Sequence, residues 1–569
     1  MTTTAAELID TLDSLGVEYV FGYPGGRVIE LLDHIPDADG DVELVRPRDE
    51  REASVMAEMY GRLTGRPGVL TGQGPWIGSL GMIGQMEARL ASSPMVVLTE
   101  ASERGEYSTL APYQQARGDY GGFSLPDILD GVSKEWWFPR TPTETVRSTQ
   151  LAFKHAVAGR PGPTAVILDG DAITDEVPTD PTPATWDART QTRTWDAAPT
   201  ATDVAAAVEA LEAAERPVII AGNGVHAAQA YDELAAVADA YDCAVVTSYL
   251  GKSTYPETDD RAAGVIGSFG HEGANRVVSE ADTLFVAGCR LNPMDTNWQA
   301  PSFIRPDEQT IVHADIDTRN AGWVYPADVG LIGDASESLA AVAEAGEASN
   351  DWAIERATAA REWFESPACT DDSVPIAPQR AVTAIRSVVD EKTIVTADSG
   401  NNRFWLLNYL QTPAVRTYFG SGGVGGMGWA TPAAVSAALT TDEETDVIAV
   451  AGDGGFSMTM NSVETAVEYG VAPTVVILND TSLGMVRQMQ HEDGDIAGVE
   501  FTDTDFPKIA EAFGAVGRRV TEPAALEGVL EEAKAADVPH VIDVRIDREA
   551  DMAATLSSSF YDSVGGLHE

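Results

Sequence analysis

Short apolar runs alternate with helix-like patterns along the whole chain. The runs are rich in Val, Ile and Ala and are bounded by Gly, Pro, Asn or Asp, which is typical of buried parallel strands. Alternation of such strands with helices predicts parallel sheets covered by helices. The runs that stand out are residues 17–26, 68–74, 94–100, 163–169, 216–225, 243–249, 282–288, 310–317, 393–400, 446–455, 473–480 and 540–547.

Two stretches interrupt this pattern. Residues 176–202 are rich in Pro and Thr and lack apolar periodicity, and residues 345–376 form a weaker break. The 569 residues also suffice for about three domains. The sequence therefore predicts an α/β protein of three doubly wound domains with mainly parallel sheets. Their predicted bounds are residues 1–178, 200–345 and 375–550.

Composition and charge narrow the classes of partner. The net charge is −52, from 89 acidic and 37 basic residues, so the chain should repel nucleic acid and anionic membranes. The recurring apolar runs argue against disorder and favour a folded protein with an acid-covered surface, as in a high-salt cytoplasm. An ordinary acidic protein is the alternative. No run approaches the roughly 18 apolar residues of a membrane span, and the N-terminus lacks a signal-peptide pattern. We therefore expect a cytoplasmic protein.

The strongest local motif lies in the third predicted domain. A strand runs into Gly452-Asp453-Gly454-Gly455, a helical pattern follows, and the next strand ends at Asn479-Asp480. The glycines allow the backbone to approach a phosphate, and a helix start offers free N–H groups. Asp453 and Asp480 both lie at predicted strand ends, where Mg²⁺ could bridge them to a diphosphate. The alternative is a tight turn with solvated carboxylates.

This stretch resembles the cofactor motif of the thiamine-diphosphate enzymes, in which GDG is followed by NN. Asp480 lies 27 positions after Asp453, at the place of the second Asn. The resemblance implies that Asp453 and Asp480 bind Mg²⁺, with the backbone carbonyl of Ser482 as the third protein ligand. Because Asp replaces Asn at 480, the site is more anionic, and the choice between Mg²⁺ and Mn²⁺ stays open.

Residues 421–437 resemble the family segment that holds the middle of the cofactor. Met427 matches the apolar residue that wedges between the two cofactor rings, although core packing is the alternative for a lone Met. Gly425 matches the residue whose carbonyl accepts a hydrogen bond from the 4′-amino group. The other positions that the resemblance assigns to the cofactor are Asn401, Asn402, Gly454, Gly455 and Met485.

Residues 46–69 are similar to the family pattern that carries the catalytic glutamate, which falls on Glu50; Asp49 replaces the family's His. The family's chemistry requires a buried carboxyl group hydrogen-bonded to N1′ of the aminopyrimidine. Burial raises the pKa of such a group toward neutrality, so that it exchanges a proton near pH 7. Without the resemblance, Glu50 would read as one more surface acid.

Within the family, residues 21–33 and 483–490 resemble the large subunit of acetolactate (acetohydroxyacid) synthase. The resemblance implies decarboxylation of pyruvate and ligation to a second 2-oxo acid. Arg487 is the candidate for a substrate carboxylate, with a structural arginine as the alternative. Gln114 or Gln115 is the candidate for the synthase's active-site Gln.

Three departures qualify this resemblance. Trp76 stands where the synthase has Gly, and Met489 stands where it has the specificity Trp. Residues 288–293 depart from the segment that contributes to the FAD site, which weakens the expectation of FAD. A 2-oxo-acid decarboxylase that releases an aldehyde, and an inactive cofactor-binding homologue, are therefore the competing hypotheses. In this family the site forms between two chains, which implies a homodimer or homotetramer; a small regulatory subunit is a further partner that the resemblance raises.

Overall fold

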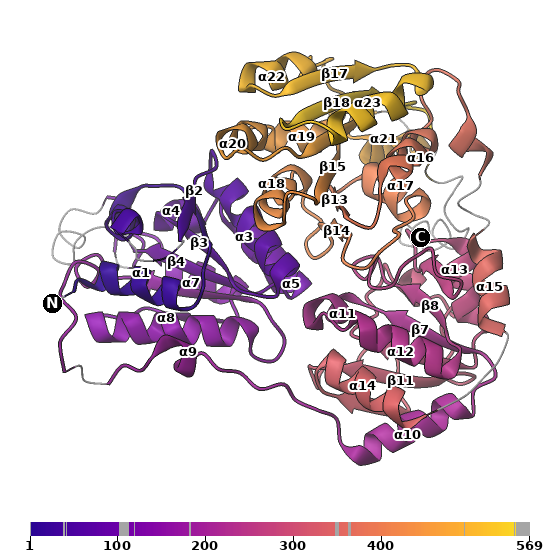
Figure 1. Cartoon of the computed structure of the whole chain (residues 1–569), viewed down its shortest axis with the longest axis horizontal. Coiled ribbons are helices and arrows are strands. Elements are labelled where there is room, and N and C mark those ends of the chain that lie inside the picture. Colours follow the sequence, from indigo (N-terminus) through magenta and orange to yellow (C-terminus); the bar gives the residue numbers. More distant parts are fainter. Residues whose placement is uncertain are drawn as a thin grey trace. The chain divides into compact units, whose positions relative to one another are not determined.

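The computed structural model describes residues 2–37, 40, 42–101, 113–118, 120–180, 184–346, 352–361, 366–493, 496–550 and 552 (Figure 1). The chain divides into two compact units. The first comprises residues 1–195, 423–426 and 435–440, and the second comprises residues 196–422, 427–434 and 441–569.

Three six-stranded sheets form the framework, and every strand pairing in them is parallel. Their strand orders are β2-β1-β3-β4-β6-β5, β12-β11-β10-β7-β8-β9 and β14-β13-β15-β16-β18-β17. The strands are β1 Tyr19–Gly22, β2 Glu43–Val45, β3 Gly68–Gly72, β4 Met95–Glu100, β5 Glu135–Trp137, β6 Pro163–Leu168, β7 Pro217–Ala221, β8 Ala244–Thr247, β9 Ala262–Val265, β10 Thr283–Ala287, β11 Thr310–Asp315, β12 Val329–Ile332, β13 Thr393–Ala397, β14 Tyr418–Gly420, β15 Asp446–Gly452, β16 Thr474–Asn479, β17 Val516–Val520 and β18 His540–Arg545.

Helices connect most pairs of successive strands and supply the layers on the sheets. They are α1 Thr4–Ser14, α2 Ile29–Leu32, α3 Glu50–Thr64, α4 Gly74–Ile77, α5 Met82–Ala91, α7 Leu125–Val132, α8 Pro142–Val157, α9 Ala188–Gln191, α10 Ala201–Glu212, α11 Asn223–Ala228, α12 Tyr231–Tyr241, α13 Glu272–Glu280, α14 Ala335–Ala345, α15 Trp352–Arg361, α16 Pro378–Val388, α17 Asn401–Tyr409, α18 Ala430–Thr440, α19 Asp453–Thr459, α20 Ser462–Glu468, α21 Gly484–Asp493, α22 Phe506–Phe513 and α23 Leu526–Lys534.

The second sheet shows why these strands read as continuous apolar runs. Along β7, Ile219 packs in a core with α10, α11, α12 and α14, while its neighbours Val218 and Ile220 pack in a separate core with α13 and α15. Successive side chains of a strand point to opposite faces. Because helices cover both faces, every position of β7 is apolar and buried.

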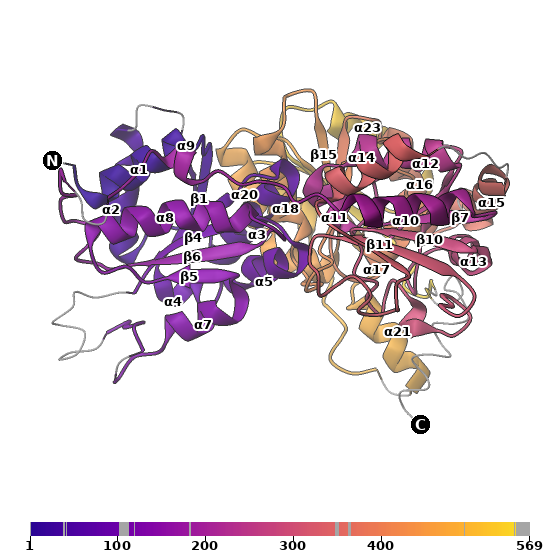
Figure 2. The same ribbon diagram turned by 90° about the horizontal axis from the view of Figure 1, so that it is seen from below.

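The first and third sheets are covered in the same manner. Figure 2 shows α1 and α8 on one side of the first sheet and α5 and α7 on the other. In the third sheet, one core joins α16, α17 and α23 to alternate residues of the central strands, among them Ile448, Val476 and Ile542. The prediction of an α/β fold with three parallel-sheet domains is confirmed, whereas the three domain boundaries stay predictions.

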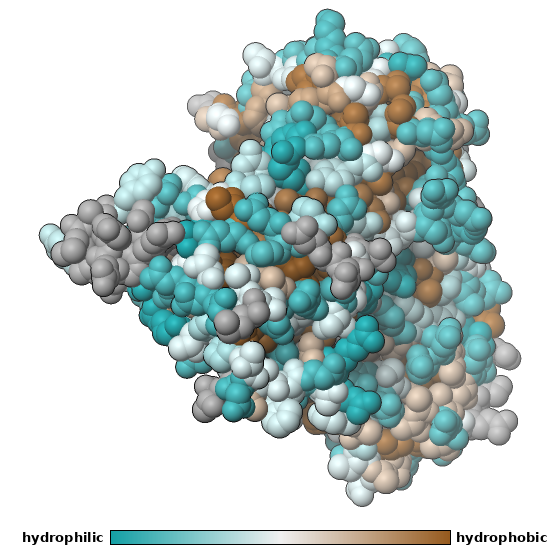
Figure 3. Space-filling model, turned by 60° about the vertical axis from the view of Figure 1, so that its left-hand side comes forward, coloured by the Kyte–Doolittle hydropathy of each residue, from teal (hydrophilic) through white to brown (hydrophobic). Residues whose placement is uncertain are grey.

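Each predicted apolar run contains a strand, and these strands are the four inner ones of each sheet. The edge strands β2, β5, β9, β12, β14 and β17 were not predicted. The three cysteines, Cys243, Cys289 and Cys369, are buried and free. On the face drawn in Figure 3, hydrophilic residues predominate and apolar ones form small separate groups. Among the described residues, no helix combines the length and apolarity needed to cross a bilayer.

Candidate active site

Two aspartates meet at the carboxyl-terminal edge of the third sheet. Strands β15 and β16 are neighbours with Gly452 opposite Leu478. Asp453 follows the end of β15 as the first residue of α19, and Asp480 follows the end of β16. Because parallel strands end at the same edge, the two carboxylates come from adjacent strand ends. The fold thus brings together the two metal ligands that the sequence predicted.

The electrostatics of this edge favour a bound cation. Burial, reinforced by the charge of Asp480, raises the pKa of Asp453 to about 7. Burial also raises the pKa of Asp480, although hydrogen bonds from Ser482 oppose this shift. Burial disfavours the charged form of each carboxylate, and a cation between them would favour it.

The surrounding residues fit a metal-bound diphosphate. A Cβ on Gly454 would come within 3.2 Å of Met427 Cε, and a Cβ on Gly484 would lie 2.4 Å from Asp480 Oδ2. The Oδ1 atom of Asn401 is buried and has no partner. In the part of the chain that the structure describes, no group of three or more His, Cys, Asp or Glu gathers as a metal site. The predicted donor set, two carboxylates and a carbonyl oxygen, has the chemistry that a hard cation prefers.

The remaining predicted cofactor residues divide into two kinds. Met427 lies beside Gly454, as just described, and Met485 is partly buried against the core of the third sheet. Asn402 instead donates to the carbonyl oxygens of Asp398 (2.9 Å) and Val450 (3.4 Å), so it braces the backbone.

Sequence reasoning missed Asp398, at the end of β13. Its fully buried carboxylate accepts hydrogen bonds from the backbone N–H groups of Ser399, Gly428 and Ala430. Burial raises the pKa of Asp398 to about 6 despite these bonds. Because Gly428 follows Met427, Asp398 fixes the backbone beside the predicted wedge. Its only local signal is an acidic residue directly after a buried strand.

Gly425 belongs to the segment 423–426 that packs in the first unit, and its φ of +73° explains the glycine. The backbone N–H groups of Gly423 and Val424 donate to the Glu87 carboxylate at 2.7 and 2.8 Å. Glu87 also pairs with the buried Arg62 at 2.9 Å. This contact between α5 and the glycine segment was not predicted from the sequence.

Glu50 is the first residue of α3 and is 5% exposed. Asp49 caps the helix by accepting a hydrogen bond from the Glu52 N–H at 3.0 Å. Burial raises the pKa of Glu50, and this effect outweighs the opposing contribution of the helix-start backbone. A Cβ on Gly72, at the end of β3, would lie 3.3 Å from Glu50 Cγ. Glu50 is therefore a buried acid at a helix start with a raised pKa, and a raised pKa suits a proton-transfer group.

A chain of hydrogen bonds links Trp76 to Gln114. The Trp76 indole donates to Gln73 Oε1 at 3.1 Å, and the Gln73 amide donates to Gln114 Oε1 at 2.8 Å. Gln73 was not predicted, although it follows β3 as Asp453 follows β15. Glu100, at the end of β4, is also buried, and the Gly74 N–H donates to it at 3.3 Å. Trp76 itself remains 44% exposed.

Two further predicted substrate residues lie at α21. Arg487 donates to the Arg548 carbonyl oxygen at 3.0 Å and forms an ion pair with Glu549 at 2.7 Å. These bonds favour the structural alternative for Arg487. Met489 is 53% exposed, so its side chain is available to a ligand.

Residues 288–293, which depart from the family's FAD pattern, lead into a turn held by local hydrogen bonds. Asn292 Nδ2 donates to Asp295 at 2.5 Å, and Asn292 Oδ1 accepts from the Met294 N–H at 2.8 Å. Leu291 is buried. The polar groups of Asn292 are thus used within the turn.

Comparisons with known proteins identify the family. Residues 2–120, 204–342 and 398–544 match the N-terminal TPP-binding, central and C-terminal TPP-binding domains of thiamine pyrophosphate enzymes. The chain is 31% identical to a probable acetolactate synthase large subunit of Methanocaldococcus jannaschii, covering 95% of this chain and 92% of that protein. It is 32% identical to the acetolactate synthase large subunit of Parasynechococcus marenigrum, covering 96% of this chain and 87% of that protein. It is 30% identical to the acetolactate synthase isozyme 3 large subunit of Escherichia coli, covering 94% of this chain and 92% of that protein. The chain belongs to the thiamine pyrophosphate enzyme family.

Proposed function

We propose that this enzyme decarboxylates a 2-oxo acid, pyruvate in the first instance, and ligates the remaining fragment to a second 2-oxo acid. The observation that carries the proposal is that the chain has both a buried Glu50 in the first unit and an aspartate pair at the carboxyl-terminal edge of the third sheet. The names of the relatives, acetolactate synthase large subunits, support the ligation step.

In the proposed mechanism, Asp453, Asp480 and the Ser482 carbonyl would hold Mg²⁺ together with the diphosphate of the cofactor. Thiamine diphosphate supplies the electron sink that makes loss of CO₂ from a 2-oxo acid feasible. Met427 would pack against the rings of the bound cofactor, and the Gly425 carbonyl would accept a hydrogen bond from its amino group.

Glu50 supplies the proton transfer. Its carboxyl group would hydrogen-bond N1′ of the bound aminopyrimidine and would hold or release a proton there. The raised pKa of Glu50 suits this role, because burial moves the pKa of the carboxyl group toward the pH at which a general acid or base works best.

Trp76 bears on the fate of the reaction. Its side chain occupies volume that a second 2-oxo acid needs in the synthase, and its link through Gln73 to Gln114 holds it in place. A decarboxylase that releases an aldehyde is therefore the second candidate function.

The proposal includes a homodimer or homotetramer and a fold suited to high salt. The relatives are named large subunits, so a small regulatory subunit is a further proposed partner. The polar groups of Asn292 are used within its own turn, which argues against an FAD site at this segment. Light scattering in molar KCl measures the oligomer, and a monomeric mass with full activity would contradict it.

Product analysis tests the reaction. The purified chain is incubated in molar KCl with thiamine diphosphate, Mg²⁺ and pyruvate, with and without 2-oxobutyrate, and the products are identified by mass spectrometry. We expect acetolactate and acetohydroxybutyrate, both absent with Glu50→Gln. Acetaldehyde alone would support the decarboxylase, and cofactor binding without CO₂ release from any 2-oxo acid would support an inactive homologue.

A further inference from the structure

The loop that carries Asp480 turns sharply at Thr481. Thr481 has a φ of +59°, in the left-handed region that β-branched residues rarely adopt. The side chain of Asn479 stabilises this turn, because its Oδ1 accepts a hydrogen bond from the Thr481 N–H at 3.0 Å. Asp480 Oδ1 then accepts from the Ser482 N–H at 2.9 Å. The directions of Asp480 and Ser482, two of the three predicted metal ligands, thus depend on the turn that Asn479 stabilises.

Asn479 is itself held by a buried carboxylate. Its Nδ2 donates at 2.8 Å to Oδ1 of Asp543, a fully buried residue of β18. Asp543 lies opposite Ile477 in the register of β16 and β18, so it shares a sheet face with Asn479. Its neighbours Ile542 and Val544 point to the apolar core on the other face.

The second oxygen of Asp543 binds Arg519. Arg519 stands directly opposite Asp543 on β17, and its Nε donates to Asp543 Oδ2 at 2.8 Å. A buried carboxylate is strongly unfavourable unless it is paired and hydrogen-bonded. Asp543 meets both conditions, with one partner on each side.

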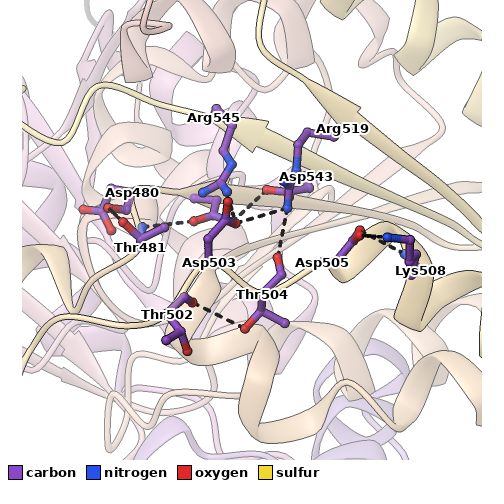
Figure 4. Close-up of polar contacts among 11 residues, drawn as sticks. Asp480, Thr481, Thr502, Asp503, Thr504, Asp505, Lys508, Arg519, Asp543 and Arg545 are labelled. Atoms are coloured by element: carbon purple, nitrogen blue, oxygen red, sulfur yellow. Dashed lines mark hydrogen bonds and ion pairs between the residues drawn. The ribbon is translucent and has the colours of Figure 1, made fainter.

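Arg519 also reaches the segment that pairs with the metal loop. Its Nη2 donates to the Thr504 carbonyl at 2.9 Å and to Asp503 at 3.3 Å, and Arg545 binds the same Asp503. Figure 4 shows the two arginines converging on Asp503, with the Asp480 carboxylate directed away from them. Upstream, the Phe501 N–H donates to the Thr481 carbonyl at 2.9 Å.

We propose that Asn479, Asp543 and Arg519 form a clamp that positions the metal loop 480–482 for Mg²⁺. They are positioning residues, because they act through the backbone turn and not as ligands. Mg²⁺ demands near-octahedral oxygen geometry, so its affinity is sensitive to the direction of each ligand. The inference rests on the proposed metal site, and the alternative is that the clamp stabilises the fold alone.

A reciprocal exchange of the two side chains tests the clamp. In Asn479→Asp, two carboxylates face each other. In Asp543→Asn, the amide has one oxygen where the carboxylate had two, so it cannot replace both the hydrogen bond from Arg519 and the one from Asn479, and the negative charge is lost. The double variant Asn479→Asp/Asp543→Asn restores every hydrogen bond with one direction reversed and keeps the total charge. Arg518→Gln is the matched control. Arg518 lies beside Arg519 on β17 but forms an exposed ion pair with Glu532 of α23.

The readouts are the Kd of Mg²⁺ at saturating thiamine diphosphate, by isothermal titration calorimetry, and the Tm of the metal-free protein. We expect each single variant to raise the Kd about tenfold or more, the range known for residues that orient metal ligands. The double variant should bind nearly as the wild type does, and Arg518→Gln should leave the Kd unchanged.

The variant Asp453→Ala distinguishes a failure of the clamp proposal from a failure of the proposed metal site. If this variant abolishes Mg²⁺ binding while the single clamp variants lower only the Tm, the metal site stands and the clamp is refuted. A double variant with no recovery of Kd also refutes it. If the wild type shows no Mg²⁺-dependent cofactor binding, the metal site and the clamp fall together.

Discussion

The first and third sheets have the same topology but different chemistry at the same edge. Counted in chain order, the strands of both follow the order 2-1-3-4-6-5, whereas the second sheet follows 6-5-4-1-2-3. In the third sheet the third strand is followed by Asp453, and the fourth by Asp480. In the first sheet Gln73 follows β3 as Asp453 follows β15, and Glu100 ends β4 as Asn479, the residue before Asp480, ends β16.

The two edges differ in the polar residues that they bury. The third sheet places two carboxylates and several glycines together, so it offers charge and space to a metal-bound diphosphate. In the first sheet, Gln73 follows the third strand and accepts a hydrogen bond from Trp76 of α4. The acid of this edge, Glu50, comes from the helix after β2. In the proposed function, one topology would thus support a binding edge and a proton-transfer edge, because function depends on the residues at the edge and not on the fold.

The largest expected effect separates the two edges. Glu50→Gln should lower turnover by about 10²–10⁴-fold, the usual contribution of a general acid or base. It should leave Mg²⁺-dependent cofactor binding intact, whereas Asp453→Asn should lose that binding. Steady-state CO₂ release and calorimetry measure the two properties. Loss of cofactor binding in Glu50→Gln would show that the first sheet also contributes to binding.

The pH dependence of metal binding should follow Asp453. Its pKa of about 7 in the metal-free protein means that protons compete with Mg²⁺ below neutrality. We expect the apparent Mg²⁺ affinity to rise about tenfold from pH 6 to pH 8 and then to level off. The metal-free fold should lose stability as pH rises from the ordinary value of 3.8 toward 7, because the unfolded chain ionises this group first.

Asp480→Asn sharpens the same measurement. Removing the neighbouring charge lowers the pKa of Asp453, so the midpoint of the affinity curve should move to lower pH. A midpoint that stays in place would show that burial alone sets the pKa of Asp453.

Trp76→Gly should change the product ratio rather than the rate of CO₂ release. The substitution opens volume for a second 2-oxo acid, and we expect the ratio of ligated product to aldehyde to rise about tenfold, the scale of pocket-size effects on specificity. Exposed Tyr120→Gly in the same unit is the control. An unchanged ratio, as measured by mass spectrometry, would exclude Trp76 as the determinant.

The smallest expected effect concerns Arg487. Arg487→Gln loses the bonds to Glu549 and the Arg548 carbonyl, which should lower the free energy of unfolding by about 1 kcal/mol. The KM for pyruvate should stay unchanged if the arginine is structural. A large rise in KM without a loss of stability would instead assign Arg487 to the substrate carboxylate.

The sequence by itself determined the inner strands and the residues that follow them. Strands buried on both faces are apolar at every position, so they are visible in the linear pattern. The edge strands lack this signal for a physical reason: β2 and β17 expose Glu43 and Arg518 to solvent, while β9 and β14 are only four and three residues long and contain glycine. The GDG motif and its aspartate partner were visible because each lies directly at the end of an inner strand.

Only the tertiary structure decided which polar groups meet. Asn479 and Asp543 are 64 residues apart, and Glu87 and Gly423 are 336 residues apart. Their side chains look like ordinary strand-end or helix-surface residues in the sequence. Burial removes water as their hydrogen-bond partner, so each needs a protein partner that the fold brings into reach. Local patterning therefore identified the ligands of the proposed metal site, and long-range packing supplied the residues that hold them in place.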